Sequence, residues 1–109
     1  MAIQVDRRRQ LHAELEEILG TVGKVYYQRP GGATVRMTYP CIRYTKDRGD
    51  HEYADNKNYR FVQGYQIMYI DPNPDSDIVE KLLEHFQMIS YDRHYVADNL
   101  NHDVLFVYY

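Results

Sequence analysis

Apolar residues recur with helical spacing near the N-terminus. The i, i+4, i+7, i+8 pattern predicts an amphipathic helix with one buried stripe. The stripe consists of Leu11, Leu15, Ile18, Leu19 and Val22. Asp6 is the expected N-cap, and Gly20 or Gly23 the expected end of the helix.

A second apolar stripe at helical spacing follows a proline-rich break at 71–74. Its members are Ile78, Val79, Leu82, Leu83 and Phe86. Asn73 can cap this helix with Pro74 at its first position. Asp75 and Asp77 would then lie in the first turn, where the helix dipole favours negative charge.

The remaining apolar runs are short and predict strands at 24–28, 41–45, 59–70, 91–96 and 102–109. In 41–45, Ile42 and Tyr44 share one face. The 59–70 strand alternates, with an apolar face expected toward the helices; that face holds Tyr59, Phe61, Tyr65, Ile67 and Tyr69. The last strand is apolar on both faces and therefore needs cover on both sides, part of which we expect another subunit to supply.

Polar segments separate these strands. Residues 29–33 form a glycine-containing turn that lacks the Gly-Lys-Ser/Thr of a phosphate loop, and 35–37 extend this loop or begin pairing. Residues 46–58 are expected to form a long polar loop, of the kind that often carries function. Residues 97–101 predict a tight turn, because Asp and Asn tolerate left-handed backbone.

The predicted order is therefore helix, three strands, helix, two strands. A chain of 109 residues is one domain. Strands linked by hairpins, with two helices packed on one face, make an α+β fold with a largely antiparallel sheet.

The amino-acid composition is unusual in its high number of tyrosines. There are 12 tyrosines and no tryptophan, and tyrosine suits both sheets and interfaces. The net charge of −3 argues against wholesale nucleic-acid binding. The run Arg7, Arg8 and Arg9 is either a solvated helix start or a contact with a neighbouring chain or DNA.

The single cysteine, Cys41, excludes an internal disulfide and is expected to be a small buried hydrophobic residue. No stretch approaches the roughly 20 apolar residues of a membrane helix. The N-terminus lacks a signal-peptide core, so we expect a cytosolic chain.

Motifs for chemistry are missing from the sequence. The five histidines show no paired ligand spacing, so we predict no metal site. Asp55-Asn56-Lys57 matches half of a nuclease signature, but Pro74-Asp75 follows it instead of preceding it. Neither Ser76 nor Ser90 sits in a nucleophile elbow. We predict no catalytic residue and no cofactor, and hence no enzyme.

Several separated strings nevertheless resemble one family. They are Leu-His-Ala-Glu-Leu-Glu-Glu-Ile-Leu-Gly (11–20), Tyr-Pro-Cys-Ile-Arg-Tyr (39–44), Ala-Asp-Asn (54–56), Ile-Asp-Pro-Asn-Pro-Asp-Ser (70–76) and Arg-His-Tyr-Val-Ala-Asp-Asn-Leu-Asn-His-Asp (93–103). Together they look like the tail terminator or tail completion proteins of long-tailed bacteriophages. The resemblance implies an α+β subunit of a hexameric ring that caps the tail tube and meets the head connector. DNA would pass through the ring without sequence-specific binding, and the protein would end in the virion.

Contact residues are the expected functional residues of such a subunit. Contact with a neighbouring ring is expected from Asp47, Arg48, Asp50, His51, Glu52, Tyr53, Asp55, Asn56 and Lys57. Subunit contact is expected from Asp98, Asn99, Asn101, Tyr108 and Tyr109, and a partner or DNA contact from Arg7, Arg8 and Arg9. The alternatives are hairpin closure for the turns and ordinary packing for the final tyrosines.

Two other functions fit the same sequence. One is a head-completion or stopper protein on the capsid side of the joint. The other is a small regulatory domain that binds nucleic acid through its arginines.

Overall fold

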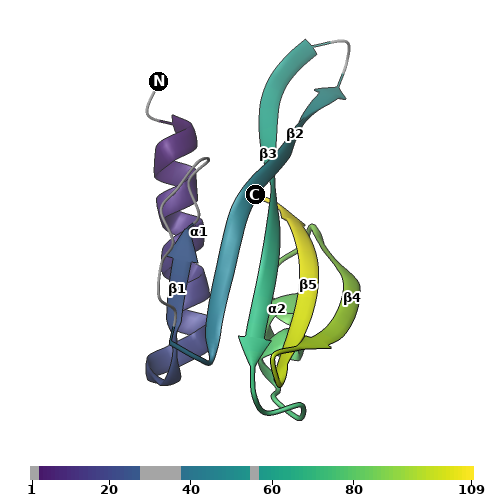
Figure 1. Cartoon of the computed structure of the whole chain (residues 1–109). Helices are drawn as coiled ribbons and strands as arrows, with labels where there is room; N and C mark the ends of the chain where they lie inside the picture. The colour runs from purple at the N-terminus through teal and green to yellow at the C-terminus, as the bar shows by residue number, and fades with distance from the viewer. Residues whose placement is uncertain (1–2, 28–37, 55–56) are drawn as a thin grey trace.

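The computed structural model describes residues 3–27, 38–54 and 57–109 (Figure 1). In this part of the chain the helices and strands follow the predicted order. They are α1 (Ile3–Leu19), the 3-10 turn η1 (Gly20–Val22), β1 (Lys24–Tyr27), β2 (Cys41–Ala54), β3 (Lys57–Asp71), α2 (Ile78–His85), β4 (Ile89–Ala97) and β5 (Leu100–Tyr108). Neither described helix has the length and apolarity needed to cross a membrane.

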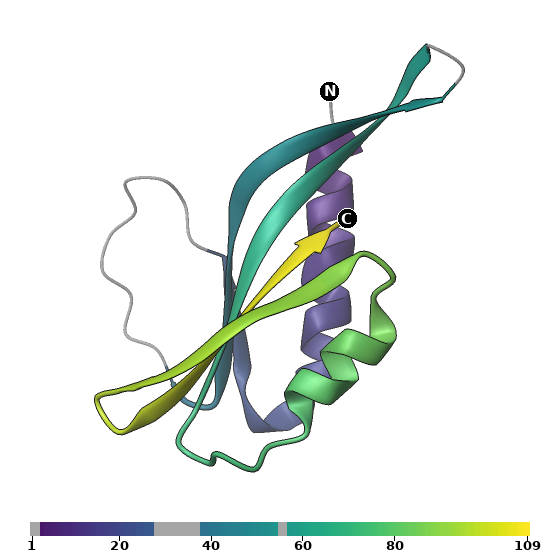
Figure 2. The same ribbon diagram turned by 90° about the vertical axis from the view of Figure 1, so that its right-hand side faces the viewer.

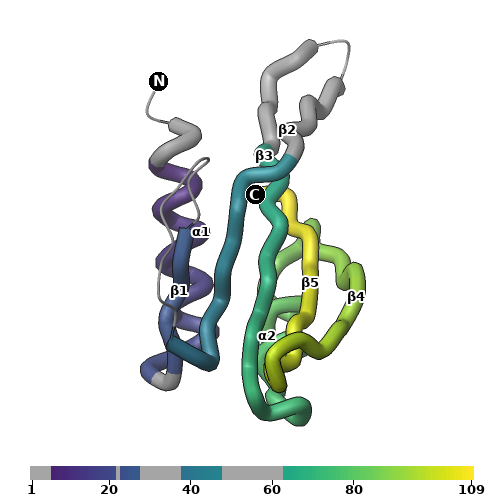
Figure 3. The backbone as a smooth tube through the Cα atoms, in the orientation of Figure 1, coloured from purple at the N-terminus to yellow at the C-terminus, as the bar shows by residue number. Residues whose placement is uncertain are grey.

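The described strands form one five-stranded sheet in the order β1-β2-β3-β5-β4. β1 and β2 are parallel, and every other pair is antiparallel. The predicted α+β fold is confirmed. α1 and β1 lie at one side of the molecule, and β5 and β4 at the other (Figure 3).

The hydrophobic core lies between the sheet and the two helices, which are on the same side of it (Figure 2). We call this side of the sheet the helix face and the opposite side the outer face. Strand alternation sends every second side chain to the helix face. The core contains Leu11, Leu15 and Leu19 of α1, Ile78 and Leu82 of α2, and sheet residues including Val25, Ile42, Tyr44, Tyr65, Ile67, Tyr69, Leu105 and Val107. Each buried aliphatic side chain contributes about 1.5–3 kcal/mol.

The start of α1 differs from the prediction. The helix begins at Ile3, so Asp6 lies inside its first turn and does not act as the N-cap. The arginine run therefore comes after the first turn. The predicted end is correct, because the helix stops at Leu19 and Gly20 has a φ of 75°, which glycine adopts at little cost.

The start of α2 is also later than predicted. Asn73 does not cap it, and Asp77 holds the N-cap position without a side-chain bond. Two local bonds compete with helix formation over 73–77. Asn73 Oδ1 accepts the Asp75 N–H at 3.0 Å, and Ser76 Oγ accepts the Ile78 N–H at 3.3 Å. Short polar side chains that bond nearby backbone in this way favour turns over helix.

The largest difference concerns residues 46–58, which do not form the predicted loop. β2 continues to Ala54 and β3 starts at Lys57, with a ladder that runs from Gly49↔Gln63 to Ala54↔Lys57. β1 pairs with β2 only as far as Tyr44, and β5 pairs with β3 only from Gly64 onward. We call residues 47–54 and 57–62 the β2–β3 extension. Its strands pair only with each other within the described residues.

Some predicted features lie outside the described residues. These are the glycine-containing turn at 29–33, the segment 35–37, and Asp55 and Asn56.

Gly23 is required where β1 begins. A Cβ at this position would lie 2.2 Å from the carbonyl oxygen of Pro40. We therefore expect Gly23→Ala to lower the free energy of unfolding by about 1–3 kcal/mol, measured by urea denaturation. The exposed neighbour Thr21→Ala is the control and should change little. Equal stability of the two variants would show that the backbone around Pro40 yields easily.

Candidate interaction surfaces

The arginine run of α1 contacts the sheet of its own subunit. The guanidinium carbon of Arg7 lies 5.1 Å from the ring centre of Tyr109, and that of Arg8 lies 4.3 Å from the ring centre of Tyr27. Such cation–π contacts hold a planar guanidinium against an aromatic face. Arg7 and Arg9 are exposed, and Arg8 is half-buried. Arg7 and Arg8 thus contact aromatic rings of their own chain, and the partner or DNA contact of the three arginines stays a prediction.

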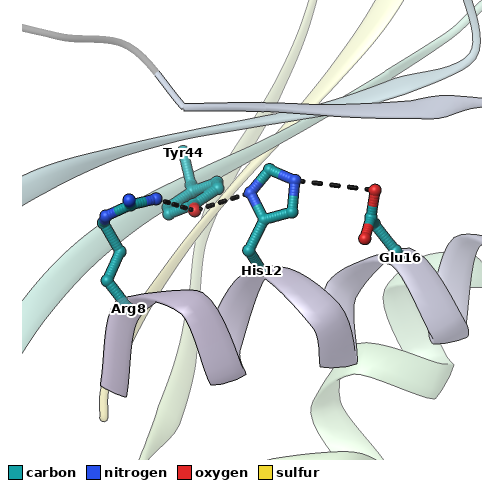
Figure 4. A network of polar contacts seen from close by, with 4 residues as sticks. All are labelled: Arg8, His12, Glu16 and Tyr44. Carbon is teal, nitrogen blue, oxygen red and sulfur yellow. Dashed lines mark hydrogen bonds and ion pairs between the residues drawn. The ribbon is translucent and has the colours of Figure 1, made fainter. Parts of the chain in front are cut away.

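Arg8 also belongs to a polar chain between α1 and β2 (Figure 4). Its Nη1 donates to the hydroxyl oxygen of Tyr44 at 3.2 Å, and the same oxygen lies 2.8 Å from Nδ1 of His12. Nε2 of His12 lies 3.6 Å from Oε2 of Glu16. The Tyr44 hydroxyl can accept from Arg8 and donate to Nδ1 of His12 in the tautomer that carries its proton on Nε2.

Tyr44 anchors this chain in the core. Its side chain is fully buried, and its ring contacts Tyr27 and Tyr65. Burial raises the pKa of Tyr44 above its ordinary value, and the hydrogen bond from Arg8 partly opposes this. The neutral Tyr44 hydroxyl, placed between Arg8 and His12, thus fixes the position of α1 on the sheet.

Glu14 makes a second polar contact between α1 and its neighbours. The Tyr109 hydroxyl donates to Oε2 of Glu14, and Nε2 of His85 lies 2.6 Å from Oε1. The ring of Tyr109 also packs edge-on against Phe86. Burial, followed by the hydrogen bond to Glu14, raises the pKa of Tyr109 to about 12. One carboxylate thus joins α1, α2 and the C-terminal residue.

The final tyrosines point to opposite faces of the sheet. Tyr109 packs against the core, and its backbone exchanges hydrogen bonds with Gln63. Tyr108 pairs with Gly64, and its ring contacts Phe106 on the outer face. Tyr109 therefore has an internal role, whereas Tyr108 lies on a face that no described helix covers.

A hairpin turn forms within the predicted segment 97–101, but it is shorter than predicted: it consists of Asp98 and Asn99, while Ala97 ends β4 and Leu100 begins β5. Asp98 and Asn99 have φ values of 54° and 62°, as a two-residue hairpin turn requires. Asn101 Nδ2 donates to the carbonyl oxygens of Asp71 at 3.2 Å and Pro72 at 3.3 Å. Asn101 ties the hairpin to the end of β3, while Asp98 and Asn99 are exposed.

The predicted contact residues at 47–57 lie mainly in the β2–β3 extension. β2 contains Asp47, Arg48, Asp50, His51, Glu52 and Tyr53, and β3 begins with Lys57. The carbonyl oxygen of Asp47 accepts a hydrogen bond from Nε2 of Gln63 at 3.2 Å, at the base of the extension. The structure thus brings these positions together on one two-stranded ribbon.

Edge strand β4 is a surface that the sequence did not single out. Its exposed fractions are 43% for Tyr91, 36% for Tyr95 and 62% for Val96. A shallow depression of about 380 Å³ lies beside it on the outer face, lined in part by Gln66, Phe106 and Tyr108. The sequence pattern of Tyr91, Arg93 and Tyr95 did not reveal this surface, because strand order is set by distant elements and a register shift between Tyr91 and Arg93 moves Tyr91 to the other face from Arg93 and Tyr95.

Four histidines contact groups of the same chain. His12 lies 2.8 Å from the Tyr44 hydroxyl oxygen, and His85 lies 2.6 Å from a carboxylate oxygen of Glu14. His94 lies 3.2 Å from the side-chain oxygen of Asn101, and His102 lies 3.0 Å from the carbonyl oxygen of Leu100. Among the residues that the structure describes, no cluster of three or more His, Cys, Asp or Glu could hold a metal ion. Burial raises the pKa of the Cys41 thiol to about 11.

The fold and these contacts define a small α+β protein whose polar network connects its helices to its sheet. No protein-family model matches the chain, and no curated protein matches it.

Tyr44 provides a test of the α1 contact. Tyr44→Phe removes the hydroxyl but keeps the ring, and leaves Arg8 and His12 each without this partner. We expect a loss of about 1–3 kcal/mol in the free energy of unfolding, measured by urea denaturation. Tyr95→Phe, which loses only a weak bond to the Met68 sulfur, is the control. A Tyr44→Phe variant as stable as Tyr95→Phe would contradict the anchoring role.

Tyr109 predicts a loss of stability at high pH. Its pKa rises from 10.0 to about 12 in the fold, so the protein favours the neutral phenol. The resulting stability is complete below pH 10 and is lost as the pH rises toward 12. Urea midpoints across this range should fall, and less steeply in Tyr109→Phe. Glu14→Gln should lower the pKa of Tyr109, observed by tyrosinate absorbance, because the neighbouring negative charge is gone.

Proposed function

We propose that this chain is a structural subunit of the tail or neck of a long-tailed bacteriophage. As a tail terminator it forms a ring, with six subunits by the family resemblance, that caps the tail tube and ends its elongation. Its partners are copies of itself, the tube protein and the connector or stopper protein of the head. It assembles in the host cytoplasm and remains in the virion, where DNA passes through the ring.

The resemblance to this family supports the proposal because its strings are spread over the fold. Residues 11–20 lie mainly in α1, 39–44 lead into β2, 70–76 connect β3 with α2, and 93–103 span the β4–β5 hairpin. These segments belong to different layers and to both ends of the chain. A likeness distributed in this way supports a shared subunit more than a shared local motif.

The observation that carries the proposal is the β2–β3 extension. An isolated two-stranded ribbon is marginally stable in water, so a long one needs a reason to persist. In the extension, each strand pairs with the other along one edge, and its second edge has no strand partner among the described residues. Such edges suit pairing with another chain. The extension thus gives the subunit a contact separate from its body.

Ring closure needs two different surfaces on each subunit, because its contacts are head-to-tail. The extension and the outer face of the sheet, which no described helix covers, provide such a pair of surfaces. The arginine run gives less support to a nucleic-acid-binding domain, since Arg7 and Arg8 stack on tyrosines of the same chain.

Removal of the protein from the phage that encodes it tests the proposal. We expect tails of uncontrolled length in electron micrographs, because nothing would end tube growth. A variant in which a two-residue Asn-Gly turn replaces 49–62 should fold and yet fail to restore normal length. The exposed-site variant Thr21→Ala is the control and should restore it.

The other outcomes are equally informative. Tails of normal length that do not join heads would assign the protein to the head-completion side of the joint. Normal tails that join heads normally would contradict both roles.

A further inference from the structure

β4 is the last strand of the sheet, and no described segment pairs with its free edge (Figure 1). Seven of its nine residues are exposed, including Tyr91, Tyr95 and Val96. An exposed edge with apolar side chains is a template for pairing with a further strand.

A β-bulge in the middle of β4 restricts which strand can pair with this edge. The register with β5 shifts between Tyr91 and Arg93, so Asp92 is the extra residue. Before the bulge, Ile89 and Tyr91 lie opposite core-facing residues of β5. After it, Arg93 lies opposite a residue of the outer face. Odd-numbered residues therefore change faces at Asp92.

This change selects the way in which β4 can pair with itself. Residues directly opposite in an antiparallel pair must lie on the same face of the sheet. If a regular strand pairs with its own copy about a two-fold axis between two residues, each odd-numbered residue lies opposite an even-numbered one. Such residues point to different faces of the sheet, so this pairing cannot form. With the bulge, an axis between Asp92 and Arg93 matches the faces on both arms. This register places Ile89 opposite Val96, Ser90 opposite Tyr95 and Tyr91 opposite His94.

The side chains of this register are complementary. Ile89 and Val96 of two copies meet on the helix face, where both are apolar and β-branched. Asp92 of each copy lies opposite Arg93 of the other, so opposite charges meet at the axis. In a single copy Arg93 Nη1 already binds Asp92 Oδ2 at 2.6 Å, and both side chains are more than half exposed. Because both side chains are at the surface, each can leave its partner in the same chain and bind the opposite charge of the second copy.

We propose that two copies of this chain pair through their β4 strands, antiparallel about an axis between Asp92 and Arg93. The two sheets then form one continuous sheet across the axis. This inference goes beyond the proposed role in the tail and does not rest on it, because the pairing concerns the isolated protein in solution. A bulge with charged residues can also protect an edge from pairing. In that case the protein is monomeric, which the following experiments detect.

Charge exchange tests the pairing. Sedimentation equilibrium of the full chain should show a monomer–dimer equilibrium. Asp92→Arg and Arg93→Asp each place like charges opposite each other, and each should weaken the dimer roughly tenfold or more. The double variant D92R/R93D should restore it, since the pairs reform with exchanged signs. A protein that is monomeric at all concentrations, or a dimer that ignores these changes, would overturn the proposal.

Disulfide formation tests the register. Ser90→Cys with Tyr95→Cys places two thiols opposite each other across the axis, while within one chain they are about 16 Å apart along the strand. We expect this double variant to form a disulfide-linked dimer under mild oxidation. Ser90→Cys with Ala97→Cys, which would meet only in a register shifted by two and which keeps Asp92 and Arg93, is the matched control. Equal crosslinking of both would overturn the register. The native Cys41 is buried and should not react.

Discussion

Buried tyrosines impose the constraint that organises this molecule. Their rings supply much of the apolar surface between sheet and helices, but a buried hydroxyl without a partner is costly. The hydroxyl of Tyr44 contacts Arg8 and His12 of α1, and that of the partly buried Tyr109 donates to Glu14. Tyr69 donates to Asp71 and lies 2.9 Å from Ser76 in the turn before α2. The polar side chains of the helices and turns are thus fixed by the sheet below them.

This constraint also explains the unfavourable charge order of α1. Arginines near the start of a helix and glutamates near its end oppose the helix dipole, by about 0.3–1 kcal/mol per group. In the fold Arg8 stacks on Tyr27 and bonds Tyr44, while Glu14 binds Tyr109 and His85. These tertiary contacts offset a local preference that the isolated helix could not satisfy. The tyrosine excess therefore serves the interior of the subunit to a large extent.

The sequence predicts the parts of the fold that depend on an apolar face. Leu11, Leu15 and Leu82 are buried as their helical spacing requires, and Ile67 alternates as a half-buried strand should. The turn at Asp98 was predictable from side-chain chemistry alone. The β3 side of the β2–β3 extension was predicted from Tyr59 onward, but its β2 side was not, because residues 46–54 are polar and show no apolar alternation. The start of α2 was missed because the bonds of Asn73 and Ser76 act locally against helix. Among the contact residues, the sequence located polar stretches but not the internal partners of Arg7, Arg8 and Tyr109, which come from distant elements.

The exposed tyrosines differ from the buried ones in their position in the sheet. β2 and β3 have strand neighbours on both sides, and their helix-face tyrosines Tyr44, Tyr65 and Tyr69 are buried beneath the helices. β4 is an edge strand, and its tyrosines stay partly exposed on both faces: Tyr91 on the helix face at 43% and Tyr95 on the outer face at 36%. Composition alone cannot separate these two groups, because a tyrosine on an inner strand and one on an edge strand have the same local pattern. Strand order decides which aromatic rings build the subunit and which are available to another chain.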